Sequence, residues 1–257
     1  MSSYLKSEMY KTTHRVYPYV LLIICVVIAI LINFAVFYAQ KVMKLPYTIE
    51  GSDLLMAGLY VMSNIIWYMI IFTTDIGFSG EWRNNTMKNC VSFGVSRNTI
   101  FIGKCLINLI LLIIGIVVVS AVYLLTNYLC FKSDGSLTSE IYKDYFLRFL
   151  AMLPLIIAGQ TMASSLCMFF STDLLWCGIY AVIIAFLPNG LLLLSSLFED
   201  VQGLWTAYIH MPTTCLNQIS FQGINGDIIS RSLSVAAVVF LVPFVLSIIV
   251  FNKKEIK

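Results

Sequence analysis

Apolar residues along the chain fall into six long runs, each separated from the next by a more polar stretch. The runs extend over approximately Tyr19–Ala39, Leu54–Thr74, Ile100–Tyr128, Phe146–Phe170, Asp173–Leu197 and Ser232–Phe251. Each is as long as the roughly 20 residues that a helix needs to cross a bilayer. The pattern predicts an all-α integral membrane protein with six transmembrane helices, built as a single domain over residues 1–257.

An amphipathic helix is predicted ahead of the first span, over residues 2–17. Leu5, Met9 and Val16 recur at steps of four and seven, while the basic residues of this segment lie on other faces. A helix of this kind lies at the membrane surface. Pro18 disfavours a helical conformation at the residue before it and suits the first turn of a new helix, so the chain should bend there.

The fifth run and the segment after it both contain breaks. Pro188 interrupts the run and removes a helical hydrogen bond, so a kink is expected. Residues 198–231 are too polar to cross the bilayer, yet they contain side chains suited to its outer interface, namely Trp205, Tyr208, Ile209 and Phe221. Glycines and Pro212 among them permit sharp reversals. We expect a re-entrant outer loop that forms part of an exit gate, or else an aromatic belt that only anchors the neighbouring spans.

Composition and charge narrow the class of protein. Of the 257 residues, 60% are hydrophobic and 11% are charged, with a mean hydropathy of +0.89, whereas about a quarter of the residues in soluble domains are charged. Six spans leave no stretch long enough for a soluble catalytic or nucleotide-binding domain. The net charge of +3 is too small to indicate nucleic-acid binding.

Lysine and arginine counts predict the orientation of the chain in the cell membrane. Ten of these residues lie on the side of both termini and the stretch Asp75–Lys104, and six lie on the other side, which accounts for all 16. Because positive charge favours the cytoplasmic side, both termini are expected to be cytoplasmic.

The stretch Asp75–Lys104 is the longest polar interruption between two spans. Within it, Glu81–Asn89 could form a short helix across the membrane surface, with Trp82 toward the spans and Lys88 toward water or a partner. Such a helix transmits force only if it is rigidly joined to the spans. The alternative is a solvated loop whose charges only fix the topology.

The same stretch carries an extended sequence pattern. From Glu81 to Lys104 the chain has an acidic residue followed by Asn-Asn-Thr-x-Lys-Asn, then Ser-x-Gly-Val-Ser-Arg and a lysine that opens the next span. This pattern resembles the cytoplasmic loop of type-two ABC exporter permeases, and the resemblance extends over nearly the whole chain. The segment Tyr4–Lys11 and the chain length are most similar to permeases that expel lantibiotics and related antimicrobial peptides. Asn85 departs from the family, which often has Gly there.

The resemblance implies a permease without an ATPase site of its own. In that family the loop between spans two and three contains a coupling helix that contacts a separate ATPase subunit, braced by the N-terminal helix. Carried over, the contact comprises Glu81, Trp82, Arg83, Asn84, Asn85, Thr86, Lys88 and Asn89. The implied partners are membrane lipid, two ABC ATPase subunits that bind ATP and magnesium, and a second permease, identical or paralogous. The implied activity is the outward movement of an amphipathic or hydrophobic cargo, such as an antimicrobial peptide or drug.

A non-transport membrane protein, either an intramembrane protease or an assembly scaffold, is the alternative. Gly77-Phe78-Ser79-Gly80 matches the GxSG of rhomboid-type proteases, with Ser79 as the nucleophile. That chemistry needs a nearby base, but the two histidines, His14 and His210, fall in the N-terminal tail and the outer loop. No catalytic residue is therefore assigned.

Five amide side chains within the spans are candidates for lining a polar cavity: Asn33, Asn64, Asn108, Gln160 and Asn189. Because an unpaired amide in hydrocarbon is costly, each should face either another helix or such a cavity. The seven cysteines show no CxxC and no pair spaced with histidine, so no metal site is predicted. Cys130 and Cys215 fall on the predicted outer side, where an impermeant thiol reagent should label Cys215 and could also label Cys130, whereas Cys90 should not react. A disulfide between Cys130 and Cys215 is conceivable.

Overall fold

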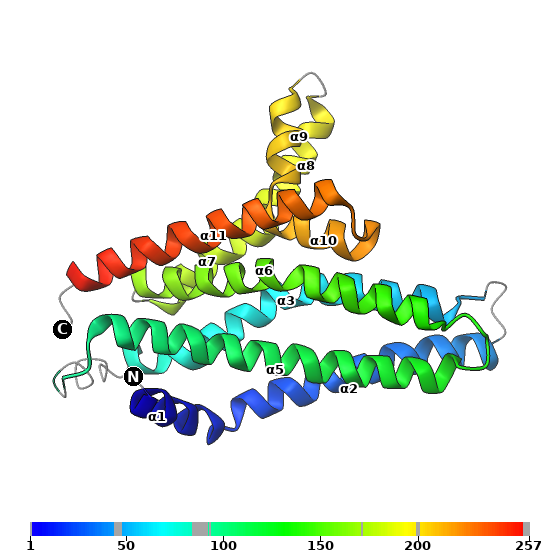
Figure 1. Cartoon of the computed structure of the whole chain (residues 1–257), viewed down its shortest axis with the longest axis horizontal. Helices are drawn as coiled ribbons and strands as arrows, with labels where there is room; N and C mark the ends of the chain where they lie inside the picture. The colour runs from blue at the N-terminus through cyan, green and yellow to red at the C-terminus, as the bar shows by residue number, and fades with distance from the viewer. Residues whose placement is uncertain are drawn as a thin grey trace.

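A computed structural model describes residues 2–43, 48–83, 92, 94–170, 172–198 and 201–253, with the backbone alone described at residues 2, 3 and 79–83. Every regular element within these ranges is helical. Figure 1 shows a bundle of long helices running along one axis, with a helical hairpin standing out from its side. The first helix and the end of the last lie at the same end of the bundle, as an even number of spans requires.

Within the described residues, six helical segments are long and apolar enough to cross a membrane, which confirms the predicted number of spans. Five of them are single helices. These are α2 (Tyr17–Lys41), α3 (Gly51–Arg83), α5 (Arg97–Phe131), α6 (Ser139–Phe169) and α11 (Gly226–Lys253). The remaining segment is compound and comprises α7 (Asp173–Ala181), the π-helix η1 (Val182–Phe186) and α8 (Leu187–Leu197).

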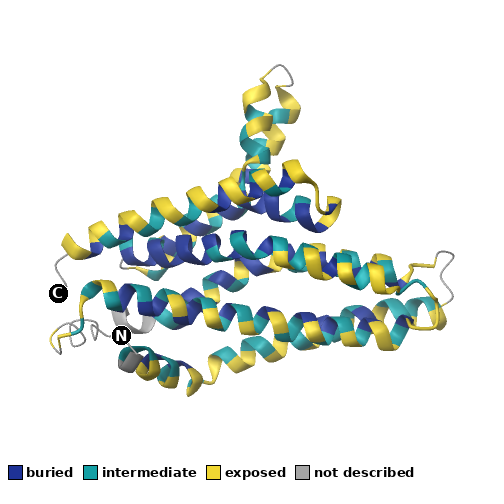
Figure 2. Cartoon of the chain, in the orientation of Figure 1, coloured by how far each residue is buried: buried dark blue, intermediate teal, exposed yellow. Residues whose placement is uncertain are grey.

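Helix α6 lies at the centre of the bundle and packs against both α3 and α11, while α5 packs against α2 and α3. In its most apolar window, 61% of α6 residues are buried, against 11% for α2. Figure 2 shows the same contrast, with buried residues on the inward faces and exposed ones along the outside of α2 and α11. The exposed apolar faces are those that lipid would cover.

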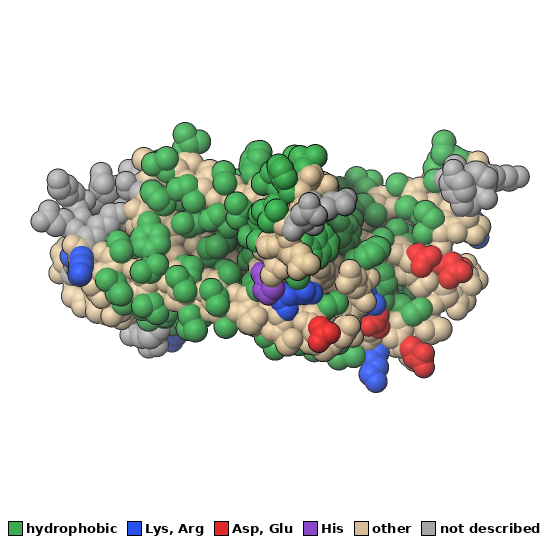
Figure 3. All heavy atoms as spheres, turned by 90° about the horizontal axis from the view of Figure 1, so that it is seen from above, with side chains coloured by type: hydrophobic (Ala, Val, Ile, Leu, Met, Phe, Trp, Pro, Cys, Tyr) green, Lys and Arg blue, Asp and Glu red, His purple; other side chains and the backbone are tan. Residues whose placement is uncertain are grey.

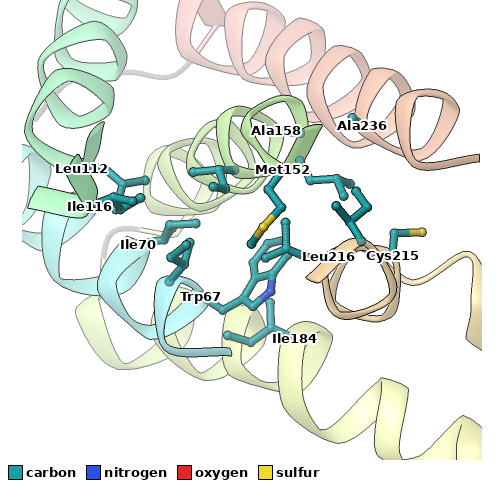
Figure 4. Packing of buried hydrophobic residues seen from close by; sticks show 14 of the residues in the cluster. Trp67, Ile70, Leu112, Ile116, Met152, Ala158, Ile184, Cys215, Leu216 and Ala236 are labelled. Atoms are coloured by element: carbon teal, nitrogen blue, oxygen red, sulfur yellow. The ribbon is translucent and has the colours of Figure 1, made fainter. Parts of the chain in front are cut away.

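Two groups of buried apolar residues hold the bundle together. The larger surrounds Trp67, Met152 and Leu216 at the centre, where α3, α6 and α10 meet (Figure 4). The smaller includes Phe78 and Phe101, close to the end of the bundle where α1 lies. Figure 3 shows hydrophobic side chains over much of one face, with the visible acidic side chains in the half away from the chain termini and basic ones toward both ends.

The fifth span changes direction at η1. There the amide of Leu187 donates to the carbonyl of Val182, five residues back, instead of four. Helix α7 runs along the bundle, whereas α8 points away from it and forms a hairpin with α9 (Gln202–Ile209) (Figure 1). The break expected at Pro188 is thus present, but it begins one turn earlier.

Helix α10 (Pro212–Gln222) returns from the hairpin and packs on α3, α6 and α11. Arg148 of α6 donates to the carbonyls of Ser220 (2.9 Å) and Phe221 (3.4 Å) at the end of α10, and it also pairs with Asp144 at 2.7 Å. Gly223 follows with φ of +87°, and a Cβ there would lie 2.9 Å from the Arg148 guanidinium. The positive φ favours glycine here, and any other residue would also displace the Arg148 guanidinium.

The polar stretch between the second and third spans is shorter than predicted. Helix α3 continues to Arg83 instead of ending near Thr74, and α5 begins at Arg97. The reason is packing: Ile76 and Phe78 are buried, so this part of the polar stretch still contributes to the core.

The N-terminal helix α1 (Ser2–Thr13) is present, but its buried side differs from the predicted one. Glu8 and Thr12 are buried, whereas Leu5 and Met9 are only partly covered. The hydrophobic spacing therefore did not identify the face that packs on the bundle. The bend falls at residues 14–16, and Pro18 lies in the first turn of α2, as expected.

Candidate functional site

A polar pocket of about 150 Å³ lies beside the break in the fifth span, between α3, α10 and the base of the projecting hairpin. Its lining residues are Asn64, Trp67, Tyr68, Ile184, Ala185, Pro188, Asn189, Tyr208, Thr213, Thr214 and Asn217. Trp67 occupies the middle of α3, so the pocket lies about halfway along the bundle. Polar side chains at such a depth mark a candidate functional site.

Trp67 contributes a hydrogen-bond donor that has no acceptor. The ring is 2% exposed, and its Nε1 makes no hydrogen bond. The opposite edge of the ring packs on Gly159 of α6, where an added Cβ would lie 2.5 Å from Cζ3. The N–H edge is therefore turned away from α6, next to Ile184, which also lines the pocket (Figure 4).

The first turn of α10 supplies more donors to the same pocket. The first backbone amides of a helix have no acceptor within it. In α10, Met211 donates to Tyr208 and Pro212 has no N–H, which leaves the amides of Thr213 and Thr214. The Thr213 hydroxyl is also buried and makes no hydrogen bond. Because a helix N-terminus carries a partial positive charge, this wall favours an oxygen acceptor.

Asn217 fixes α10 against α3. Its Oδ1 accepts from the Ser63 hydroxyl at 2.7 Å, and its Nδ2 donates to Oδ1 of Asn64 at 3.1 Å. Ser63 also lies 3.3 Å from the Ser220 hydroxyl. Both polar ends of Asn217 are thus occupied by α3 groups, which holds the first turn of α10 over Trp67.

The broken span forms the third wall. Ile184 and Ala185 belong to η1, and Pro188 and Asn189 follow in α8. The Asn189 amide donates to the carbonyl of Ala185 at 2.7 Å, bridging the break. Single π-turns within α-helices occur frequently at functional sites, and this one shapes the pocket directly.

The arrangement is suited to binding, because none of the lining residues is Asp, Glu, His, Lys or Arg. The titratable side chains of the lining are the phenols of Tyr68 and Tyr208, so the lining offers no carboxylate or imidazole for acid–base catalysis. Among the described residues, no three His, Cys, Asp or Glu side chains gather closely enough to hold a metal ion. Both histidines use Nδ1 within their own helix, His14 toward the Tyr10 carbonyl and His210 toward that of Thr206.

Comparison with known proteins places the chain in one family. The family described as protein of unknown function (DUF2705) matches residues 18–257, which include all six spans and every residue that lines the pocket. The chain belongs to this family. No curated protein matches the chain. All of α1 lies ahead of the matched region.

Two of the five amides proposed for a cavity reach this pocket, namely Asn64 and Asn189. The other three are buried between helices. Asn33 of α2 donates to the Tyr123 carbonyl (3.1 Å) and to the Thr126 hydroxyl (2.7 Å) of α5.

Gln160 of α6 joins α6 to α3, since its amide accepts from Thr73 (2.8 Å) and donates to Thr74 (2.9 Å). Asn108 of α5 fills a close contact with Gly77 of α3, and neither of its polar atoms has a hydrogen-bond partner. Helix packing thus explains these two amides as well as Asn33.

The four side chains proposed for an outer gate separate into two groups. Tyr208 lines the pocket and packs against Trp205, with ring centroids 5.4 Å apart, and Ile209 follows on the same helix. Phe221 lies at the far end of α10, where it packs edge-on against Tyr60. A gate over the pocket would therefore be formed by α9 and would exclude Phe221.

The residues proposed to contact an ATPase lie at the end of α3 and beyond it. Glu81, Trp82 and Arg83 continue α3 and do not open a new helix. Asn84, Asn85, Thr86, Lys88 and Asn89 lie outside the described residues.

Three polar contacts join this end of α3, the beginning of α5 and the N-terminal segment formed by α1 and the bend after it. Arg15 donates to the carbonyl of Ile76 at 2.8 Å. Lys104 of α5 donates to the carbonyl of Gly77 at 2.7 Å and to the Glu8 carboxylate of α1 at 3.1 Å. The beginning of α5, the end of α3 and α1 are thus joined close to Glu81.

Cys215 does not occupy the exposed position expected of it. The side chain is fully buried, and its Sγ donates to the Ile209 carbonyl at 3.3 Å. Burial raises the pKa of this thiol above its usual value, although Arg231 and Ser232 act in the opposite direction. Cys130 and Cys215 are both free. The expectation that Cys215 is open to reagents is therefore wrong.

Sequence reasoning missed Trp67, Thr213, Thr214 and Asn217, although one signal was present. Thr213, Asn217 and Ser220 recur at steps of four and three, which makes one face of a helix polar. That face was assigned to an interfacial loop, and so its packing against a span was not considered. Nothing in the sequence distinguishes Trp67 from a tryptophan within a purely apolar core.

Proposed function

We propose that this protein is the membrane-spanning permease subunit of an ABC exporter in the cell membrane. Both termini and the segment after α3 face the cytoplasm. ATP and magnesium bind to two separate ATPase subunits, and a second permease, identical or paralogous, completes the pathway. The cargo is an amphipathic or hydrophobic molecule, such as an antimicrobial peptide or drug.

The observation that carries the proposal is the continuity of α3. This helix contains Trp67, which lines the pocket, and continues without interruption to Arg83. With about 1.5 Å of rise per residue, those 16 residues span roughly 24 Å. A force applied at Glu81 can therefore move the pocket wall as a rigid body. A coupling segment requires a rigid connection of this kind.

The contacts of α1 favour the same function. Lys104 and Arg15 hold the last turns of α3 to α5 and α1. A push on the end of α3 would therefore be shared with α1 and α5. A solvated loop that only fixes topology would have no need for a buried lysine at this position.

Alternating access gives the pocket and the hairpin their roles. When the ATPases close, they push on the end of α3, and the two permease subunits rock against each other. The re-entrant segment after η1 carries Tyr208 over the pocket. Displacement of this segment would open the pocket toward the outer side.

Copurification with identification of the partner tests the proposal. The chain, tagged at its C-terminus and solubilised mildly, should bring down an ABC ATPase subunit, recognised by mass spectrometry. Vesicles containing the complex should hydrolyse ATP in a manner that depends on both chains. If no ATPase subunit accompanies the protein, and purified ATPases from its own cells neither bind it nor respond to it, the permease assignment fails.

A further inference from the structure

We propose that the pocket beside η1 binds an uncharged carbonyl oxygen of the cargo, and that Trp67 and the first turn of α10 donate the hydrogen bonds. This inference rests on the proposed export function, because it names the chemical class of molecule that such a permease would carry. Binding itself can be measured without any ATPase.

The pocket has more donors than acceptors. Nε1 of Trp67 and the hydroxyl of Thr213 lack partners, and their side chains are only 2% and 8% exposed. Because both groups are buried away from water, each donor is unfavourable unless a ligand or a bound water accepts a hydrogen bond from it. The amides of Thr213 and Thr214 add two more donors.

Acceptors in the same pocket are already engaged. Oδ1 of Asn64 accepts from Asn217, and Oδ1 of Asn217 accepts from Ser63. The carbonyl of Ala185 accepts from Asn189. A ligand group that must donate would find each of these oxygens already accepting one hydrogen bond, whereas an accepting oxygen meets the unpaired donors of Trp67 and Thr213.

The absence of Asp, Glu, His, Lys and Arg from the lining selects a neutral acceptor. An anion taken from water into the middle of the bundle loses its hydration, and a helix N-terminus offers only about half a positive charge in return. A carbonyl loses far less hydration, and indole and amide donors replace what it loses. Peptide amides and lipid esters share this chemistry.

The size of the pocket restricts the ligand further. A volume of about 150 Å³ admits one residue-sized group, because a single water takes about 30 Å³. Asn189 lies in the lining and is exposed, so the pocket opens to the outside of the bundle. Next to it, Phe186 and Leu187 are 72% and 44% exposed and apolar. The ligand is thus an apolar molecule that inserts one carbonyl-bearing unit.

Equilibrium dialysis of the purified full chain in detergent tests the proposal with radiolabelled N-acetyl-leucyl-leucinamide, an uncharged peptide. Saturable binding is expected. Trp67→Phe and Thr213→Val should each weaken it about fivefold, the effect of losing one hydrogen bond. Thr213→Val replaces a hydroxyl by a methyl of the same shape, so it tests the donor even if Trp67→Phe disturbs the core.

Two matched variants serve as controls. Trp176 is also fully buried with an unpartnered Nε1 but belongs to the other core cluster, and Thr206 lies exposed on α9. Trp176→Phe and Thr206→Val should bind the peptide as the unaltered protein does. Loss of affinity in these controls equal to that in the pocket variants would overturn the assignment of the site.

Two further ligands identify the source and charge of the carbonyl. Competition by a monoacylglycerol would show that a lipid ester enters the same site, and its failure to compete would leave the peptide amide as the ligand; both support a carbonyl site. Tighter binding of the free acid N-acetyl-leucyl-leucine would overturn the preference for a neutral group. The site itself would be overturned if neither the peptide amide nor the monoacylglycerol bound saturably, or if all variants bound with equal affinity. Neither result would affect the outcome of the ATPase copurification.

Discussion

Lys104 of α5 donates to the carboxylate of Glu8 on α1 at 3.1 Å, and only 1% of the lysine side chain is exposed. Lys104 also donates to the carbonyl of Gly77 and lies 5.6 Å from the centre of the Phe78 ring. Few lysines are buried to this extent without a paired charge. The ion pair therefore fixes how α1 lies on the bundle.

Replacing Glu8 alone should destabilise the protein markedly. Glu8→Ala removes a carboxylate that accepts from a buried ammonium at 3.1 Å, which costs about 3 kcal/mol, so thermal unfolding in detergent should shift to lower temperature. The double replacement Glu8→Leu with Lys104→Met removes both charges and should recover much of the loss. Lys11→Ala, which affects a pair 3.6 Å apart on a half-exposed side chain, should change the stability by about 0.5 kcal/mol or less. An unchanged midpoint for Glu8→Ala would contradict the structural role of the pair.

Replacing Glu81 and Lys88 together by alanine should leave the protein inserted but reduce its association with the ATPase or the stimulated ATP turnover. Glu81 belongs to the last turn of α3, and both residues are polar groups on the proposed partner face. Lys132→Ala with Glu140→Ala changes the same two charges at the opposite end of the bundle and should have no effect on either measurement. Normal ATPase copurification and transport in the first double variant would count against this segment as the contact.

Acid should weaken the connection between α3 and the loop after α5. Asp134 accepts hydrogen bonds from the amides of Gly51 (2.8 Å) and Ser136 (2.9 Å). Partial burial alone would raise the pKa of this carboxyl, but these hydrogen bonds outweigh it and hold the pKa below its usual value of 3.8. A depressed folded-state pKa stabilises the fold above the unfolded value, and this contribution is lost as the pH falls through the folded one.

The comparison of the unaltered protein with Asp134→Asn tests this pH dependence. At neutral pH the unaltered protein should unfold at the higher temperature, and the difference should shrink as the pH falls below about 3.8. A difference that stays constant from pH 7 to pH 3 would show that the hydrogen bonds do not depend on the carboxylate.

Trp205 and Tyr208 should affect transport without affecting assembly. Serine at both positions removes the ring contact on α9 and the aromatic wall of the pocket, so export should fall or ATP hydrolysis should become uncoupled from it. Phe221→Ser changes an exposed aromatic residue at the far end of α10 and should transport normally. If the double variant transports normally, or fails only because it no longer accumulates in the membrane, α9 is an anchor and not a gate.

Thiol labelling in intact cells tests both the orientation and the burial of α10. With single-cysteine variants, an impermeant maleimide should label the partly exposed Cys130 and leave Cys90 and the buried Cys215 unlabelled. Cys215 should react only after denaturation, since reactivity follows exposure and thiolate content. Labelling of Cys90 would invert the topology, and labelling of native Cys215 would contradict the packing of α10.

The hydrophobic pattern was sufficient to predict the spans, but it did not predict which helices pack against one another. Six apolar runs gave six spans, because the length of such a run is set by the bilayer and needs no tertiary information. The ends were less predictable: Phe78 extends α3 into the polar stretch because it packs on Phe101, a partner 23 residues away in the sequence.

The pocket was only partly predictable for a similar reason. Asn64 and Asn189 were singled out because amides within spans are conspicuous, and so were Asn33, Asn108 and Gln160. Distinguishing the two groups requires knowing which helices touch. Asn33 meets its partners on α5, whereas Asn64 meets a helix that a composition-based analysis assigned to the membrane surface.

The π-helix η1 sets the direction of the projecting hairpin, because its extra residue determines the rotation of α8 about the axis of the fifth span. Each residue of an α-helix turns the chain by about 100°, and a π-turn contains one residue more than the α-helix would hold. Deleting one residue between 182 and 186 would allow regular α-helical bonding and rotate everything that follows by about that angle. Asn189 and Pro188 would then leave the pocket wall together with α9 and Tyr208. A deletion of one codon would thus rotate the hairpin about the axis of the fifth span.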